Sequence, residues 1–126
     1  VRDAGRPFPS LTAGTIRVGQ RDLDVVIADD DGERIQGLRE RSDAAPYAGM
    51  LFVFDGDTTG PFTMASVLDP LDIAFFAADG RRVDQLRMVP CLGTDATCPV
   101  YRSSAPYRYA LETAAGEMPG GRLRVR

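Results

Sequence analysis

The stretch from Gly49 to Phe76 places the tightest constraint on how this chain can fold. It contains three short apolar runs separated by Gly, Pro and Asp, namely Gly49–Phe54, Pro61–Met64 and Pro70–Phe76. Runs of this length are too short for typical globular helices and are typical of strands that are buried on both faces. The sequence therefore predicts a β-sheet core built around this stretch.

Composition narrows the class of protein. The 126 residues include 44% hydrophobic and 26% charged residues, as in an ordinary globular domain that buries well over half of its unfolded surface. No apolar run approaches the length that crosses a bilayer, so no transmembrane segment is predicted. The net charge of -3 argues against nucleic acid as a partner, because such binding depends on basic residues at the phosphates. We expect a monomer.

Missing residue types exclude many chemistries. The sequence contains no His, Lys, Trp or Asn. Without His there is no Ser-His or Cys-His nucleophile pair and no imidazole metal site, and without Lys there is no Schiff base. Neither Asp29–Asp31 nor Asp55–Asp57 fits a calcium loop, since the first lacks Gly at position six and the second lacks Glu at position twelve. We expect no metal and no cofactor.

The order of predicted elements indicates one domain at 15–126 behind an extended or mobile arm at 1–14, which is rich in Pro and Gly. A helix is predicted near 32–41, with Asp31 as N-cap, Ile35 and Leu38 facing the core, and Arg34 in solvent.

Strands are expected on either side of that helix. Asp79-Gly80 predicts the tight turn of a hairpin, and the acidic segment 55–60 predicts a loop between strands. Residues 107–113 alternate as a half-buried strand does. The expected fold class is mainly β (α+β), a compact β-sandwich or flattened barrel of about seven or eight short strands with one short helix.

The two cysteines, Cys91 and Cys98, enclose a six-residue loop. Two thiols alone cannot hold zinc, and the spacing is not that of a redox Cys-x-x-Cys motif. A disulfide is the favoured interpretation, which predicts an oxidising compartment and a stabilisation of roughly 2–3 kcal/mol. A pair of free thiols in a cytosolic protein is the alternative.

Several motifs, taken together in order, resemble those of the domain of unknown function 192 family. They are Gly37-Leu38 with Arg41, Gly49-Met50-Leu51-Phe52-Val53-Phe54, Phe62-x-Met64, Pro70-Leu71-Asp72-Ile73-x-Phe75, Asp79-Gly80, Pro90 with Cys91, Cys98 and Tyr101, and Tyr109-x-Leu111-Glu112 with Gly116. The resemblance spans about 16–125.

The resemblance implies a small bacterial or archaeal protein with a compact β-rich fold, often exported or lipid-anchored, and without an agreed activity. The chain departs from the family pattern at Phe62-Thr63-Met64-Ala65-Ser66, where many members carry Phe-Trp-Met-Lys-Asn, and at Arg39, where Met usually follows Gly-Leu. If those side chains serve a ligand in the relatives, this protein has altered the contact. The resemblance implies an extracellular or cell-envelope location, with any signal or anchor preceding Val1.

Asp72 is the first candidate site residue, because it is a carboxylate between Leu71 and Ile73 in a run that is otherwise apolar. A structural interpretation has it accept backbone N–H bonds or pair with Arg41. A functional interpretation makes it a carboxylate of raised pKa that lines a pocket.

The other candidate pocket residues are Arg41, Glu112, Met64, Thr63 and Tyr101. Arg41 suits an anionic ligand or a helix end, and Glu112 faces either a cleft or solvent. Met64 is a core residue by default, although methionine also lines adaptable pockets. Tyr101 suits a stacking surface for a sugar.

Two functions follow from these observations. The first is a non-catalytic exported domain that binds a small molecule, a glycan or an envelope protein. The second is a small glycan-acting enzyme that uses Asp72 and Glu112, which requires the two carboxyl groups to face each other about 5–10 Å apart across a groove.

Overall fold

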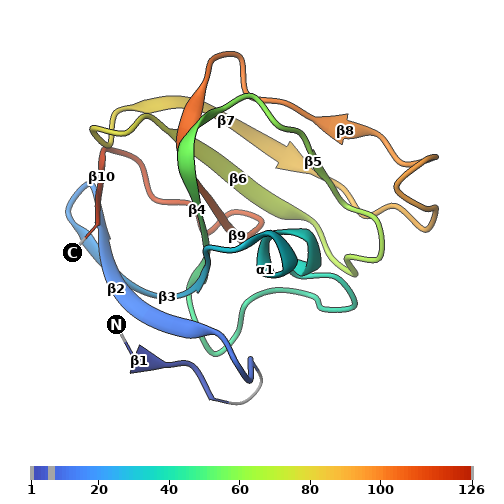
Figure 1. Ribbon diagram of the computed structural model, residues 1–126, viewed down its shortest axis with the longest axis horizontal. Helices are drawn as coiled ribbons and strands as arrows, with labels where there is room; N and C mark the ends of the chain where they lie inside the picture. Colours follow the sequence, from blue (N-terminus) through green and yellow to red (C-terminus); the bar gives the residue numbers. More distant parts are fainter. Residues whose placement is uncertain (1, 6–7, 126) are drawn as a thin grey trace.

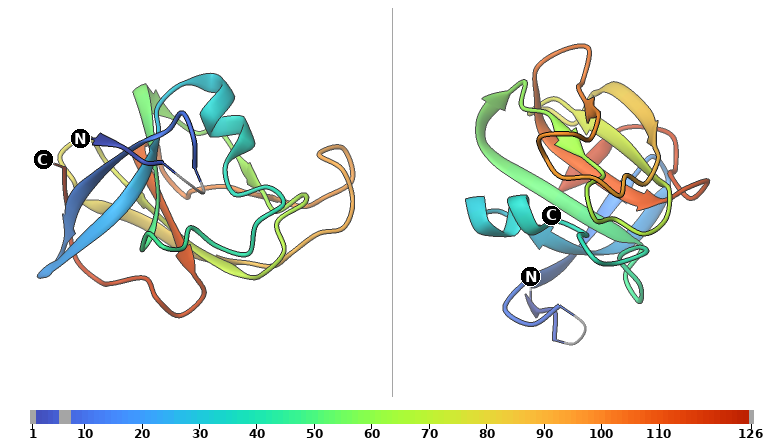
Figure 2. Two further views of the ribbon diagram at one scale, coloured as in Figure 1. Left: turned by 90° about the horizontal axis from the view of Figure 1, so that it is seen from below. Right: turned by 90° about the vertical axis from the view of Figure 1, so that its right-hand side faces the viewer.

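The computed structural model describes residues 2–5 and 8–125, which form ten strands and one helix (Figures 1 and 2). Eight strands make one curled sheet in the order β1-β2-β3-β4-β9-β6-β7 with β10 beside β2, and β5 pairs with β8 alone. The elements are β1 Arg2–Asp3, β2 Thr12–Val18, β3 Arg21–Ala28, α1 Asp31–Gln36, β4 Gly49–Thr58, β5 Phe62–Thr63, β6 Leu71–Phe76, β7 Arg82–Met88, β8 Val100–Tyr101, β9 Tyr107–Ala114 and β10 Leu123–Val125. The mainly β fold with one helix is confirmed; β1, β5 and β8, each of two residues, raise the strand number above the expected seven or eight.

Strands β4, β9 and β6 form the centre of the sheet, and both of its faces are covered there. All six residues of β6 and the first four of β4 are buried. Alternate residues feed two apolar clusters, with Met50 and Ile73 on one face and Leu51 and Ala74 on the other. The stretch from Gly49 to Phe76 is therefore the core of the fold, as its apolar runs predict.

The connection between β3 and β4 places the helix on one of these faces. The two strands are parallel, with Val25 opposite Gly49, and parallel neighbours need a crossover connection. Residues 29–48 provide it, and Figure 1 shows α1 beside β4 and toward β5. Leu38 and Ala44 from this connection are buried in the cluster that contains Met50.

The helix is shorter than the sequence predicts. Asp30, not Asp31, is the N-cap and accepts a hydrogen bond from the Glu33 N–H at 2.8 Å. The helix ends at Gln36 because Gly37 adopts a φ of 46°, a conformation that favours glycine. Ile35, within the helix, is 68% exposed rather than in the core, while Leu38 reaches the core from the turn that follows the helix.

Two connecting segments also differ from expectation. The acidic segment at 55–60 is not a loop throughout, since β4 continues to Thr58 and Asp57 forms an ion pair with Arg108 at 3.0 Å. Within the predicted arm, β1 pairs with β2, and Phe8 is buried against Tyr47. Residues 1, 6 and 7 of the predicted arm lie outside the described residues. The hairpin of β6 and β7 around Asp79-Gly80 forms as predicted.

Among the described residues, no helix is long and apolar enough to cross a membrane, since the one helix, α1, has six residues.

Candidate functional site

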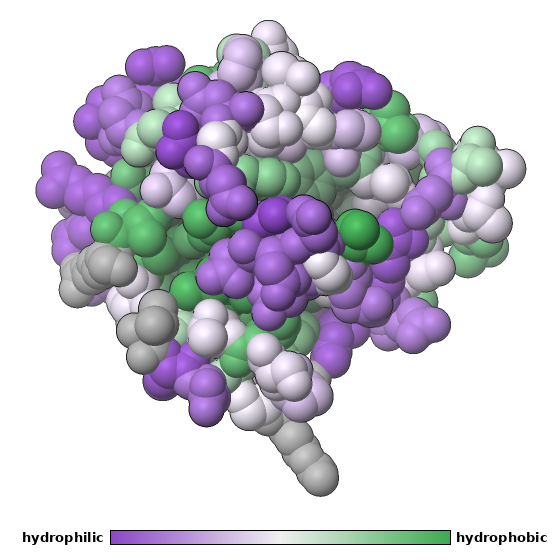
Figure 3. All heavy atoms as spheres, viewed as in Figure 1, coloured by the Kyte–Doolittle hydropathy of each residue, from purple (hydrophilic) through white to green (hydrophobic). Residues whose placement is uncertain are grey.

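A cavity of about 430 Å³ lies between α1, β4, β5 and the loop closed by the two cysteines. Its size is within the range of small-molecule sites. The side chains that define its chemistry are Phe52, Phe54, Phe62, Thr63, Arg34 and Glu112. Figure 3 shows apolar atoms in the recess beside the hydrophilic surface of the helix.

Glu112 is the buried acid of this cavity. It lies in β9 opposite Met50 of β4 and Ile73 of β6, so its side chain is on the sheet face that α1 covers. The residue is only 4% exposed, and within residues 2–5 and 8–125 no group donates a hydrogen bond to its carboxyl. Burial disfavours the charged form and raises the pKa of Glu112 to about 8. At neutral pH the free protein therefore holds a protonated carboxyl at the cavity.

Three phenylalanines form the apolar wall. Alternation along β4 puts Phe52 and Phe54 on the face of Met50, and Phe62 of β5 closes over them. The ring centroids of Phe52 and Phe62 are 5.0 Å apart and those of Phe54 and Phe62 are 6.5 Å apart, both with perpendicular planes. Edge-to-face contacts of this kind favour a fixed wall.

The rim of the cavity carries two ion pairs. The guanidinium of Arg34 donates to Asp31 at 2.8 Å and to the carbonyl of Val53 at 2.6 Å, and its Cζ is 5.0 Å from the centroid of Phe54. The Arg34 side chain is 14% exposed, so the prediction that it lies in solvent was wrong. Arg39 supplies the second pair.

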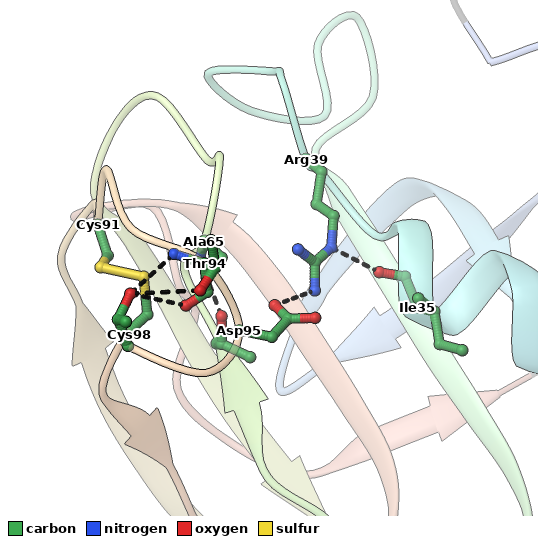
Figure 4. A network of polar contacts seen from close by, with 9 residues as sticks. Ile35, Arg39, Ala65, Cys91, Thr94, Asp95 and Cys98 are labelled. Atoms are coloured by element: carbon green, nitrogen blue, oxygen red, sulfur yellow. Dashed lines mark hydrogen bonds and ion pairs between the residues drawn. A yellow bond between two sulfur atoms is a disulfide. The ribbon is translucent and has the colours of Figure 1, made fainter.

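Arg39 joins the end of the helix to the disulfide loop (Figure 4). Its Nε donates to the carbonyl of Ile35 at 2.9 Å, and its terminal nitrogen donates to Asp95 at 2.8 Å. Cys91 and Cys98 form the disulfide that closes the loop containing Asp95. The disulfide interpretation is therefore confirmed, and the loop forms one side of the cavity rim.

The structure separates the six predicted site residues. Glu112 and Thr63 line the cavity. Met64 is 1% exposed in the core next to β5, and the Tyr101 hydroxyl accepts a hydrogen bond from the Val89 N–H at 3.1 Å, so neither side chain is among those that line the cavity.

Arg41 lies away from this cavity, with its guanidinium 4.1 Å from the ring centroid of Phe8. Together with Phe8 and Gln36 it borders a second recess of about 410 Å³. The predicted partner of Arg41, Asp72, lies elsewhere in the sheet.

Asp72 pairs with Arg87 rather than with Arg41. The two residues are opposite each other in the β6–β7 hairpin, and Arg87 donates from Nε and from a terminal nitrogen, the latter at 3.4 Å. The Gly116 N–H donates to the same carboxylate at 2.9 Å. Desolvation raises the pKa of Asp72, but the bonds from Arg87 and Gly116 outweigh it, so the pKa lies below its usual value.

The two carboxylates proposed for a glycan-acting enzyme do not face each other. Asp72 is opposite Thr113 in the pairing of β6 with β9, whereas Glu112 is opposite Ile73. Because successive residues of a strand point to opposite faces, the carboxyl groups of Asp72 and Glu112 lie on opposite faces of the sheet. The hypothesis of a hydrolase that uses this pair was therefore wrong.

Replacing Asp72 by Asn is expected to lower the free energy of unfolding by about 1–2 kcal/mol at neutral pH, since Arg87 is largely exposed and the bond to Gly116 survives. The pKa of Asp72 is depressed, so its contribution is present above its unfolded pKa and is lost as pH falls through the folded pKa. Urea unfolding at about pH 7 and about pH 2.5 measures this. Asp69→Asn, at an exposed position, is the control. A difference that is the same at both pH values would contradict the assignment.

The described residues combine a curled eight-stranded sheet, the separate pair of β5 and β8, and a pocket that contains an acid. The family model DUF192, described as "Uncharacterized ACR", matches residues 14–124, and the chain belongs to this family. No curated protein gives a match.

Two crystal structures are similar to this chain. One is a candidate transcription regulator from Sinorhizobium meliloti 1021, with 31% sequence identity, a TM-score of 0.79, and coverage of 93% of this chain and 96% of that one. The other is a protein of unknown function from Novosphingobium aromaticivorans DSM 12444, with 21% identity, a TM-score of 0.82, and coverage of 99% and 94% respectively. The first supports the family relationship, and the second shows the shared fold.

Sequence reasoning missed much of the cavity. The sequence pattern places Phe52 and Phe54 in the strand core and Arg34 in solvent, and Phe62 is a core residue by default, although aromatic residues also line adaptable pockets. The phenylalanines of β4, Phe52 and Phe54, are two positions apart, which places them on one face. No pattern in the sequence shows that α1 leaves space above that face.

Proposed function

We propose that this protein is an exported, non-catalytic domain that binds a small molecule in the cavity at Glu112. The observation that carries the proposal is a carboxyl group at an aromatic cavity that makes no hydrogen bond to the described residues and whose oxygens are open to the cavity. A carboxyl held in such a place is poorly solvated, which costs free energy when it is charged. A ligand that donates hydrogen bonds to it recovers part of that free energy.

The charged groups around the cavity favour binding over catalysis. Arg34 and Arg39 are each paired with an aspartate, and Glu112 is the remaining ionisable side chain of the lining. General acid–base chemistry on a bound substrate usually uses a second group in reach of the reacting atoms. The composition removes His and Lys from that role.

The disulfide supports export. Disulfides persist in oxidising compartments and are rare in the cytosol. The bond between Cys91 and Cys98 holds the loop that carries Asp95 at the rim. An extracellular or envelope location agrees with this feature, and the cavity volume suits a small molecule better than a polymeric glycan or a protein segment.

The similar protein from Sinorhizobium meliloti suggests a regulatory role by its description. The net charge of -3 in the present chain does not favour direct contact with DNA phosphates. A regulatory role is more compatible with ligand binding in the cavity, and this second reading uses the same site.

A thermal-shift screen with a cavity-filling control tests the proposal. Thr63→Trp places a large side chain at a cavity-lining position, and the family pattern already has Trp there. We expect at least one class of small apolar compounds with a polar group to raise the melting midpoint of the native protein by several degrees. The shift should disappear in Thr63→Trp, provided this variant keeps its own midpoint. Shifts that are unchanged in Thr63→Trp would place the ligand elsewhere.

A further inference from the structure

Glu112 differs from the other charged groups at the cavity because it alone lacks a partner. Arg34 is bonded to Asp31 and Arg39 is bonded to Asp95, each at 2.8 Å. These four charges cancel in pairs. When Glu112 is ionised, the lining therefore carries one net negative charge, and Glu112 is the most buried charged residue of the lining.

No other titratable group faces Glu112 from the strands beside it. Its neighbours in register are Met50 on β4 and Ile73 on β6, which are both apolar. The charged groups from the covering elements are those of the two rim pairs, from α1, the turn after it and the disulfide loop. No side chain among the described residues that line the cavity pairs with Glu112, so a cationic ligand would be its first charge partner.

The phenylalanine wall of the cavity also favours a cationic ligand. The faces of aromatic rings attract cations, and a cation within about 6 Å of a ring centroid gains most where water is excluded. Phe52, Phe54 and Phe62 line the cavity, and Arg34 already makes this contact with Phe54 from the rim. An anionic ligand would be repelled by the ionised carboxyl of Glu112, and both arginines of the lining are already paired with aspartates.

We propose that the cavity recognises an apolar molecule that carries a single positive charge on an amine, with the ammonium group against Glu112 and the apolar body among the phenylalanines. The inference rests on the proposed function, since it names the class of ligand for the same site. On binding, the ammonium donates hydrogen bonds to the carboxylate of Glu112. In the free protein that carboxyl is protonated at neutral pH, so its proton is released to solvent as the complex forms.

Benzylamine, benzyl alcohol and benzoate are matched probes, since they share a phenyl ring and differ in charge. Isothermal titration calorimetry of the native protein at pH 6.5 and pH 8.5 compares the affinities of the three probes. The pKa of Glu112 is about 8, so the carboxyl is mostly protonated at the lower pH and mostly ionised at the higher one. A primary amine stays charged over most of this range, as Lys does. We expect benzylamine to bind about tenfold or more tightly at pH 8.5.

Two variants distinguish two questions: whether the cavity binds a ligand at all, and whether that ligand must carry a positive charge. Glu112→Gln should weaken benzylamine binding at least about tenfold at pH 8.5 and remove its pH dependence, because the amide has no charge to offer. Thr63→Trp should abolish binding of every probe that occupies the cavity. Circular dichroism of both variants checks that they are folded.

Three outcomes are distinguishable. Benzylamine binding that tightens with pH and depends on Glu112 supports the inference. Stronger binding of benzyl alcohol or benzoate, lost in Thr63→Trp, overturns the amine assignment while the cavity remains a binding site. Failure of all three probes to bind at millimolar concentration overturns the inference and counts against the proposed function as well.

Discussion

Replacing Glu112 by Gln is expected to make the protein about 4 kcal/mol more stable than the native form at pH 8.5, and to change stability at pH 5 by no more than about 1 kcal/mol. The difference arises from the carboxyl that lies buried beside Met50 and Ile73 without a hydrogen-bond donor in the described residues. Gln has a similar shape and does not ionise.

The sign follows from the direction of the pKa shift. Burial raises the pKa of Glu112 from 4.5 to about 8. Between these values the unfolded chain has lost the proton that the folded chain retains, so unfolding becomes more favourable as pH rises. The stability is fully present below about pH 4.5 and has been lost by about pH 8. The variant lacks this titration, whereas all other groups titrate alike in both proteins.

Urea unfolding of the two proteins at both pH values gives the measurement. Glu117→Gln, at an exposed position three residues after Ala114, is the matched control and should follow the native protein at both pH values. A difference between native protein and Glu112→Gln that does not change with pH would show that the carboxyl is hydrated. In that case the proposed ligand would gain little from bonding to it.

The sequence predicts the central sheet well because its apolar runs are short, bounded by turn residues and buried on both faces. Residues 107–113 alternate as a half-buried strand does, which puts Glu112 on the polar side, facing either a cleft or solvent. In the structure β9 is central, and the crossover containing α1 covers that side. A strand pattern alone does not report what another element places over it.

The partner of Asp72 was only partly within reach of the sequence. The predicted turn at Asp79-Gly80 forms the hairpin, with Phe76 opposite Arg82, and a register shift between Phe75 and Phe76 then brings Asp72 opposite Arg87. Opposite charges directly across a pair of strands attract each other. Arg41, by contrast, was paired with Asp72 without any register argument. The end of the helix was missed for a similar local reason, since Gly37 suits a C-terminal cap as well as an interior position.

Gly49→Ala is expected to lower the free energy of unfolding by about 2–4 kcal/mol, which is a large effect for one added methyl group. Gly49 begins β4 and lies opposite Thr113 of β9, where the strands approach closely. A Cβ there would clash with the backbone carbonyl of Glu112, with the side chains of Leu111 and Thr113 only 3.2 and 3.3 Å away. The strand, not a flexible side-chain end, would have to move.

Gly56→Ala is the matched control, because it makes the same substitution in the same strand. A Cβ at Gly56 meets no atom within 4 Å, and the residue does not have a positive φ. We expect no loss of stability at Gly56, or a gain of up to about 1 kcal/mol from the reduced freedom of the unfolded chain. Thermal and urea unfolding of both variants measures the contrast, and equal effects at the two sites would contradict close packing of β4 on β9. Because the clash at Gly49 falls on the backbone of Glu112, the displacement should also move the carboxyl of the cavity. Gly49→Ala should therefore weaken binding of any cavity ligand, whereas Gly56→Ala should leave it unchanged.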